Sequence, residues 1–73
     1  MEDFRDYIDI RQDVLGGKPV IKGTRMPVDL VVAEMGGGVP MDQLLKEYGL
    51  TREQVLAAFQ YAAEVLREEV VFP

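Results

Sequence analysis

The chain has 73 residues with no cysteine and no histidine, which excludes disulfide bonds, thiolate or imidazole metal sites and histidine acid–base chemistry. Its length suits one domain, residues 1–73, and a hydrophobic content of 48% excludes a disordered polypeptide. Residues 1–27 hold five of the 13 acidic residues and five of the eight basic residues, so they have no net charge. Residues 28–73 therefore carry the whole net charge of −5, which argues against strong DNA binding by this half of the chain.

Residues 7–25 are predicted to form a short β-hairpin arm at the start of the chain. Segments 7–10 and 19–21 are rich in β-branched, aromatic or apolar residues, as is typical of short strands. Residues 13–17 between them supply turn-forming residues, including two consecutive glycines. Because two strands alone are only marginally stable in water, we expect the arm to pack against the rest of the domain.

Residues 27–68 are predicted to form a core of three helices, near residues 28–36, 41–48 and 52–68. In each helix, apolar residues recur every three or four positions, so that one face of the helix is apolar. These core stripes are Val28, Val31, Val32 and Met35; Met41, Leu44, Leu45 and Tyr48; and Val55, Phe59, Ala62 and Leu66. Pro27 fits the first position of the first helix, and glycines follow the first two helices as stop signals.

The start of the third helix has the strongest local signal in the chain. Thr51 and Gln54 match the capping box, in which each side chain accepts a hydrogen bond from the other residue's backbone N–H, and Leu50 and Val55 occupy the positions of a hydrophobic staple. A short turn that begins at Gly49 joins this helix to the second one. The pattern is that of a helix-turn-helix unit, whose second helix either reads a DNA major groove or serves only for packing. The sequence leaves both alternatives open.

The stretch GGKPVIKGTRMPV, residues 16–28, gathers Lys18, Lys22 and Arg25 among glycines. It is not a phosphate-binding P-loop, because the order of lysine and glycine in that motif is reversed here. The three bases either form ion pairs with carboxylates of the arm and the helices, or contact DNA phosphates or an acidic protein partner. Two polar residues at the start of the third helix are the candidates for added base contacts: Arg52 and Gln54.

The carboxylates of the helices fall at or near polar positions, and we interpret them as a solvated face rather than a catalytic pair. A domain of this size has no obvious substrate cleft, so we expect no enzyme activity, no catalytic or metal-binding residue and no cofactor. No apolar run approaches the roughly 20 residues of a membrane span, and the N-terminus does not resemble a signal peptide. We therefore expect a cytoplasmic protein without a membrane partner.

The arm and the third helix contain more apolar residues than a monomer of this size requires. The surplus residues are Tyr7, Ile8, Ile10, Ala58, Tyr61 and Val65. Wide apolar faces are typical of protein interfaces, so we expect a homodimer that forms through the arm, the third helix or both. The alternative is that the arm and the third helix bury each other within one chain. A further apolar segment, residues 70–73, follows the third helix.

The stretch GGKPVIKGTRMPV, together with LLKEYGLTREQVLAAFQYAAE further along the chain, resembles the family known as domain of unknown function 433. The resemblance extends from Tyr7 to Glu68 and so covers almost the whole chain. It implies a small bacterial or archaeal protein with a mainly α fold. In this fold a three-helix core, homeodomain-like or winged-helix-like, lies behind a short N-terminal β-hairpin arm.

Some members of that family resemble VapB-type antitoxins and are encoded beside PIN-like nuclease toxins. The resemblance therefore implies a small antitoxin-like regulatory protein that binds a PIN-like toxin and, as a dimer, operator DNA. Because of the net charge of −5, we expect the protein alone to bind DNA weakly. A PIN-type nuclease site is a cluster of carboxylates around Mg²⁺ or Mn²⁺, which Lys22 and Arg25 on an extended arm could enter. The alternative is a protein-interaction module that uses the helix-turn-helix unit only as a scaffold.

Overall fold

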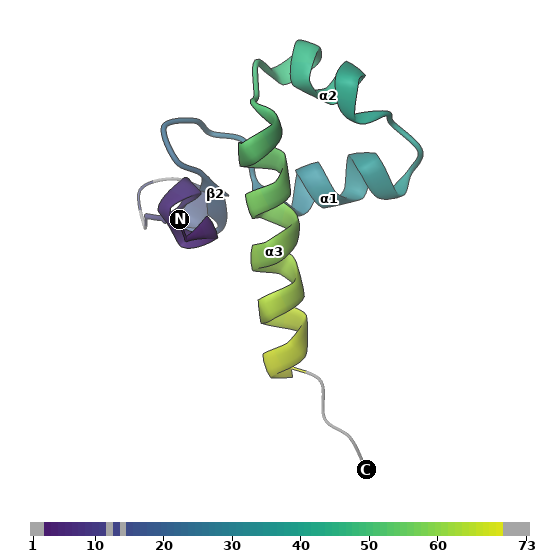
Figure 1. Ribbon diagram of the computed structural model, residues 1–73. Coiled ribbons are helices and arrows are strands. Elements are labelled where there is room, and N and C mark those ends of the chain that lie inside the picture. The colour runs from purple at the N-terminus through teal and green to yellow at the C-terminus, as the bar shows by residue number, and fades with distance from the viewer. Residues whose placement is uncertain (1–2, 12, 14, 70–73) are drawn as a thin grey trace.

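The protein is described by a computed structural model that covers residues 3–11, 13 and 15–69. In chain order its elements are η1 (Phe4–Tyr7), β1 (Ile8–Ile10), η2 (Leu15–Gly17), β2 (Pro19–Ile21), α1 (Val28–Gly36), α2 (Met41–Tyr48) and α3 (Arg52–Glu69). The fold is mainly helical, with three α-helices and a two-stranded antiparallel hairpin (Figure 1). This confirms the predicted three helices and hairpin. The apolar segment 70–73 lies outside the described residues.

The long helix α3 forms the centre of the fold. Both α1 and the 3₁₀ helix η1 pack against it, and Figure 1 shows them on opposite sides of α3, with α2 near its N-terminal end. The arm therefore packs on α3 of its own chain, which is the intrachain alternative of the sequence analysis. Among the described helices, none is both long enough and apolar enough to cross a membrane.

The hairpin has a short, well-defined register. Ile8 pairs with Ile21 and Ile10 pairs with Pro19 in antiparallel orientation. Tyr7 was predicted to begin the first strand but instead ends the 3₁₀ helix η1. That helix forms because the Asp3 carboxylate caps it, accepting a hydrogen bond from the Arg5 N–H at 2.9 Å. Sequence analysis missed this helix.

The hydrophobic core lies where β2, α1, α2 and α3 meet. Its buried residues are Ile21, Met26, Val28, Val31, Leu44, Leu50, Val55 and Ala58. At its edge, the hydroxyl of Tyr48 in α2 donates a hydrogen bond to the Glu34 carboxylate in α1 at 2.8 Å. This bond raises the pKa of Tyr48, because the neighbouring carboxylate favours the protonated hydroxyl.

The structure corrects one member of the predicted core stripe of α3. Leu66 was predicted to be buried, but it is 60% exposed. The physical reason is length: α3 has 18 residues and extends roughly 27 Å, while α1 has only nine and covers only part of it. The C-terminal part of α3 extends beyond the rest of the domain (Figure 1).

The capping box at the start of α3 forms as predicted. The Thr51 N–H donates to Oε1 of Gln54 at 2.8 Å, and the Gln54 N–H donates to Oγ1 of Thr51 at 3.2 Å. Both residues of the hydrophobic staple, Leu50 and Val55, are buried in the core. The start of α3 is therefore fixed by local bonds and by packing.

The entry into α1 differs from the prediction. Pro27 was expected at the first helical position, but it is the N-cap residue and has an extended backbone, with φ −67° and ψ 144°. The extended backbone lets Pro27 form an isolated antiparallel bridge with Val20 of β2. The chain from β2 to α1 thus folds back on itself and closes a turn over residues 22–25.

Candidate functional site

The turn that displays Lys22 and Arg25 is held by hydrogen bonds at its base and from within. The Ile21 N–H donates to the carbonyl oxygen of Met26 at 2.9 Å, which closes the base. Inside the turn, the Thr24 hydroxyl donates to the Ile21 carbonyl oxygen at 2.8 Å and accepts from the Met26 N–H at 3.0 Å. Ile21 and Met26 are buried in the core. The turn is therefore a fixed surface feature, and Lys22 and Arg25 are exposed on it.

Sequence analysis did not single out Thr24 as the residue that organises this turn. A signal was present, because serine and threonine hydroxyls often bond to nearby backbone groups in turns. Gly23 also contributes, since its φ of 81° lies in the left-handed region that glycine adopts without strain. Together the two residues explain why the chain can reverse within residues 22–25.

The basic residues of η1 and of the arm differ in whether they have an acidic partner. Three are paired: Arg5 with Asp3 and Glu64, Arg11 with Asp13 at 2.8 Å, and Lys18 with Asp29 at 3.2 Å. Lys22 and Arg25, in contrast, form no ion pair with any other residue that the structure describes. The structure therefore separates Lys18, which is tied to α1, from the other two members of the predicted basic cluster.

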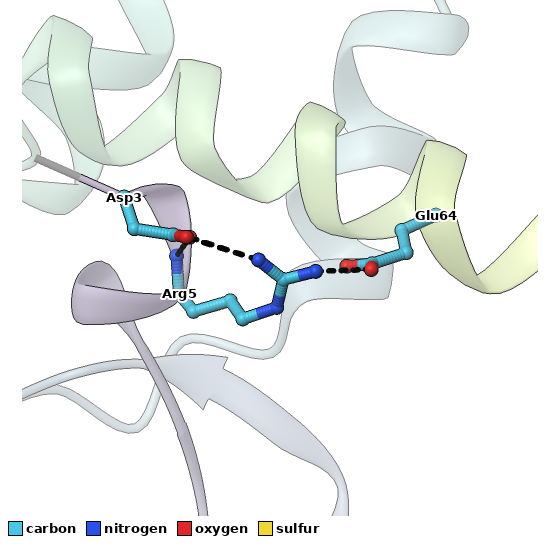
Figure 2. A network of polar contacts seen from close by, with 3 residues as sticks. All are labelled: Asp3, Arg5 and Glu64. Atoms are coloured by element: carbon cyan, nitrogen blue, oxygen red, sulfur yellow. Dashed lines mark hydrogen bonds and ion pairs between the residues drawn. The ribbon is translucent and has the colours of Figure 1, made fainter.

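Figure 2 shows the pairing of Arg5, whose guanidinium lies between the carboxylates of Asp3 and Glu64. The hydrogen bond to Glu64 is the main cause that raises the pKa of Arg5. The guanidinium carbon also lies 4.6 Å from the centre of the Phe4 ring. Arg5 thus links η1 to α3, and its charge is used within the fold.

Arg25 lines a hollow of about 490 Å³ together with Asp9, Arg11, Asp13 and Thr24. The hydrogen bond from Arg11 is the main cause that lowers the pKa of Asp13, and the positive charge of Arg25 adds a weaker effect. Arg25 is therefore close enough to act on Asp13 electrostatically without being bonded to it. A guanidinium in this position can bind a carboxylate or phosphate of another molecule through two parallel hydrogen bonds.

The two candidates for base contacts are already engaged with neighbours in the chain. Gln54 uses its acceptor oxygen in the capping box, at 2.8 Å from the Thr51 N–H. Reading an adenine through two hydrogen bonds would require that same oxygen. Arg52 is exposed and contacts the sulfur of Met41 at 3.3 Å. In this conformation Gln54 caps the helix, and its predicted base contact stays a prediction.

The predicted interface residues lie in different environments. Ala58 is fully buried, with 0% exposure, and belongs to the core of its own chain. The prediction of Ala58 as an interface residue is therefore wrong. Helical periodicity places Ala58 on a second apolar stripe, but it does not show that the core of the same chain covers this residue. Tyr7 and Ile8 are half-buried in the arm, whereas Ile10 is 55% exposed. Ile10 is thus the accessible apolar residue among the three from the arm.

The remaining two interface candidates, Tyr61 and Val65, are half-buried and line a groove between α1 and α3. The groove has a volume of about 430 Å³. Leu66, which sequence analysis assigned to the core, also lines it. The second apolar stripe of α3 is therefore accessible at its C-terminal end, where Tyr61 and Val65 line a groove that α1 does not fill.

Comparison with known proteins assigns the chain to a family. The family model described as "Protein of unknown function (DUF433)" matches residues 8–62, which is more than half of the chain. The chain belongs to the DUF433 family. The match begins at β1, includes the turn at residues 22–25 and ends within α3, so it covers both the arm and the helical core.

Two similar proteins illustrate the relationship. The "Uncharacterized protein y4eO" of Sinorhizobium fredii (strain NBRC 101917 / NGR234) is 36% identical over 59 residues, which make up 80% of this chain and 27% of that protein. The crystal structure of a DUF433 member from Anabaena variabilis ATCC 29413 matches with a TM-score of 0.80 and 37% identity, and the match covers 88% of this chain and 64% of that one. The match thus spans about a quarter of the Sinorhizobium protein and less than two thirds of the Anabaena protein.

The ion pair beside Arg25 gives a first testable prediction for this DUF433 protein. Arg11→Gln is expected to raise the pKa of Asp13, because the hydrogen bond that stabilises its ionised form is removed. Since the pKa of Asp13 is lowered in the folded chain, its ionised form favours folding above the ordinary aspartate pKa of about 3.9, and this contribution is lost as the pH falls. An NMR titration of the Asp13 carboxyl carbon measures the change, with Lys46→Gln as a control. An unchanged pKa would contradict the pairing.

Proposed function

We propose that the protein is a small antitoxin-like regulatory protein that acts by binding rather than by catalysis and presents Lys22 and Arg25 to an acidic, PIN-like protein partner. The observation that supports this proposal is the difference among the arm bases: these two are exposed and have no ion pair within the described residues, whereas Arg5, Arg11 and Lys18 are paired. Exposed cations on a fixed turn are suited to recognise carboxylates that lie in a cleft.

The chemistry of such a partner site favours Arg25 as the main contact. A PIN-type site holds Mg²⁺ or Mn²⁺ with carboxylates, because hard cations prefer oxygen ligands. A guanidinium inserted among these carboxylates would compete with the metal and bind one of them through two hydrogen bonds. Because the hydrogen-bonded turn already fixes the backbone around Arg25, little backbone conformational entropy is lost when the complex forms.

Within this proposal the unit formed by α2, the turn at Gly49 and α3 is a homeodomain-like or winged-helix-like scaffold, and operator DNA is not its main ligand. Two observations support the scaffold role. The acceptor oxygen of Gln54 is engaged in the capping box, and residues 28–73 have a net charge of −5. Phosphate binding requires cations, so the protein alone is expected to bind DNA weakly. Self-association is also part of the proposal, with Ile10 as the exposed apolar residue of the arm.

Co-expression with the product of a neighbouring gene tests this proposal. We expect a PIN-like neighbour to co-elute with the protein in size-exclusion chromatography, and the complex to weaken as salt is raised, because its contacts are ionic. In parallel, DNA from upstream of the gene is expected to be retarded only weakly by the protein alone at low salt. Strong, salt-dependent retardation of that DNA without a protein partner would favour a DNA-binding regulator, and absence of co-elution would contradict the proposal.

A further inference from the structure

The groove between α1 and the C-terminal half of α3 is a second surface, lined by residues other than those of the hollow around Arg25. Its walls are apolar: Val28 and Val32 come from α1, and Tyr61, Val65 and Leu66 come from α3. An ion pair between Lys18 and Asp29 lies at its edge, at 3.2 Å. Lys18 and Pro19 of the arm line its edge, whereas η1 packs on the opposite side of α3 and does not fill it (Figure 1).

The shape of the groove fits a helix. On each wall, two apolar residues are four positions apart in the same helix, Val28 and Val32 in α1 and Tyr61 and Val65 in α3. Rows of residues with this spacing form the ridges that interdigitate when helices pack against each other. The α3 residues that line the groove run from Tyr61 to Leu66 and extend roughly 8 Å, so the groove offers space beside about one and a half turns of an added helix.

The charges around the groove determine which kind of helix fits. The last six residues of α3, 64–69, have a net negative charge, with three acidic residues and one basic residue: Glu64, Glu68, Glu69 and Arg67. The basic residues near this end of α3, Arg5 and Arg67, line a different hollow together with Phe4, on the side of the arm. The C-terminus of α3 adds a partial negative charge from the helix dipole. The open end of the groove is therefore negative, while Lys18 at its edge is neutralised by Asp29.

We propose that this groove binds an amphipathic helix of a partner protein, with an apolar face in the groove and lysine or arginine residues beside the C-terminus of α3. A second copy of this chain is a poorer occupant, because its helical half also carries a net charge of −5 and would bring like charges together. This second binding surface does not depend on the proposed function, because neither Lys22 nor Arg25 lines the groove.

Fluorescence anisotropy with two labelled peptides tests the proposal. Both peptides have 15 residues and the same leucines at helical spacing; one carries lysine and arginine on its polar face, and the other carries glutamate at those positions. We expect the cationic peptide to bind and to shift NMR signals of α1 and of residues 61–68. Leu66→Glu is expected to weaken binding about tenfold or more, because it removes an apolar contact and adds a charge to the groove. Glu68→Lys should also weaken it.

The matched control is Leu56→Glu, which changes an exposed leucine of the same helix on the side of the arm, where Leu56 lies with Phe4 and Tyr7. It should leave binding unchanged, as should Arg25→Ala, which tests the proposed function separately. Because Leu66 is exposed, its variant should keep the helical circular dichroism spectrum. Equal binding of both peptides, no binding of either, or unchanged binding by Leu66→Glu would overturn the proposal. So would a dimer in sedimentation that Leu66→Glu converts to a monomer, since the occupant would then be a second copy.

Discussion

Leu44→Ala is expected to lower the melting temperature by about 10–30 °C, the largest effect of any single truncation considered in this protein. Leu44 is fully buried, with 0% exposure, and it is the one buried residue of α2. Truncation of a buried leucine costs about 2–5 kcal/mol, because it removes apolar contacts and leaves a cavity. A domain of 73 residues has a free energy of unfolding of only about 4–11 kcal/mol.

Thermal unfolding followed by circular dichroism at the helical band measures this effect. Leu30→Ala in α1 is the matched control, because Leu30 is an exposed leucine and its truncation should change the melting temperature by only a few degrees. If both variants melted at the same temperature as the parent, the assignment of Leu44 as the anchor of α2 would be wrong.

Arg25→Ala is expected to weaken the complex with a PIN-like partner about 30-fold to 1,000-fold, while the fold stays intact. The range corresponds to a loss of roughly 2–4 kcal/mol, within what is measured when one member of a buried charged pair is removed from an interface. The fold should not change, because Arg25 is exposed and forms no ion pair with the described residues of its own chain. Arg25→Lys should give an intermediate affinity, since it keeps the charge but loses the planar fork.

Isothermal titration calorimetry with the co-purified partner measures these affinities, and circular dichroism checks the fold. Lys46→Ala is the matched control: it removes one exposed positive charge from α2, outside the turn. An unchanged affinity of Arg25→Ala would show that Arg25 is irrelevant to the complex. Unfolding of this variant would instead show that Arg25 has a structural role.

The helix bounds were predictable from sequence because the signals that set them are local. Gly49 adopts φ 65° at the end of α2, and the capping box fixes the start of α3. The end of α3, observed at Glu69, was predicted one residue earlier because no glycine or proline marks it. The family was predictable for a similar reason, since a continuous stretch of sequence carries the resemblance.

The candidate site was less predictable because it depends on contacts between distant segments. Periodicity places both Ala58 and Leu66 on apolar stripes of α3, but only the packing of the other elements decides that Ala58 is buried in the core and Leu66 is exposed. Likewise, the sequence shows that Lys18, Lys22 and Arg25 are close together in the chain, but not that Asp29 neutralises only Lys18 among them. The groove could not be foreseen, because its walls come from two helices of unequal length.

The link between Arg5 and Glu64 has a consequence for the order in which the protein folds. These residues are 59 positions apart in the chain, and η1 packs directly on α3. During synthesis, the arm emerges from the ribosome long before its docking surface exists. A two-stranded hairpin is marginal in isolation, so the arm cannot settle until α3 has been translated. Because the turn with Lys22 and Arg25 is flanked by Ile21 and Met26, which are buried in the core, we expect it to reach its final position only when the whole domain folds.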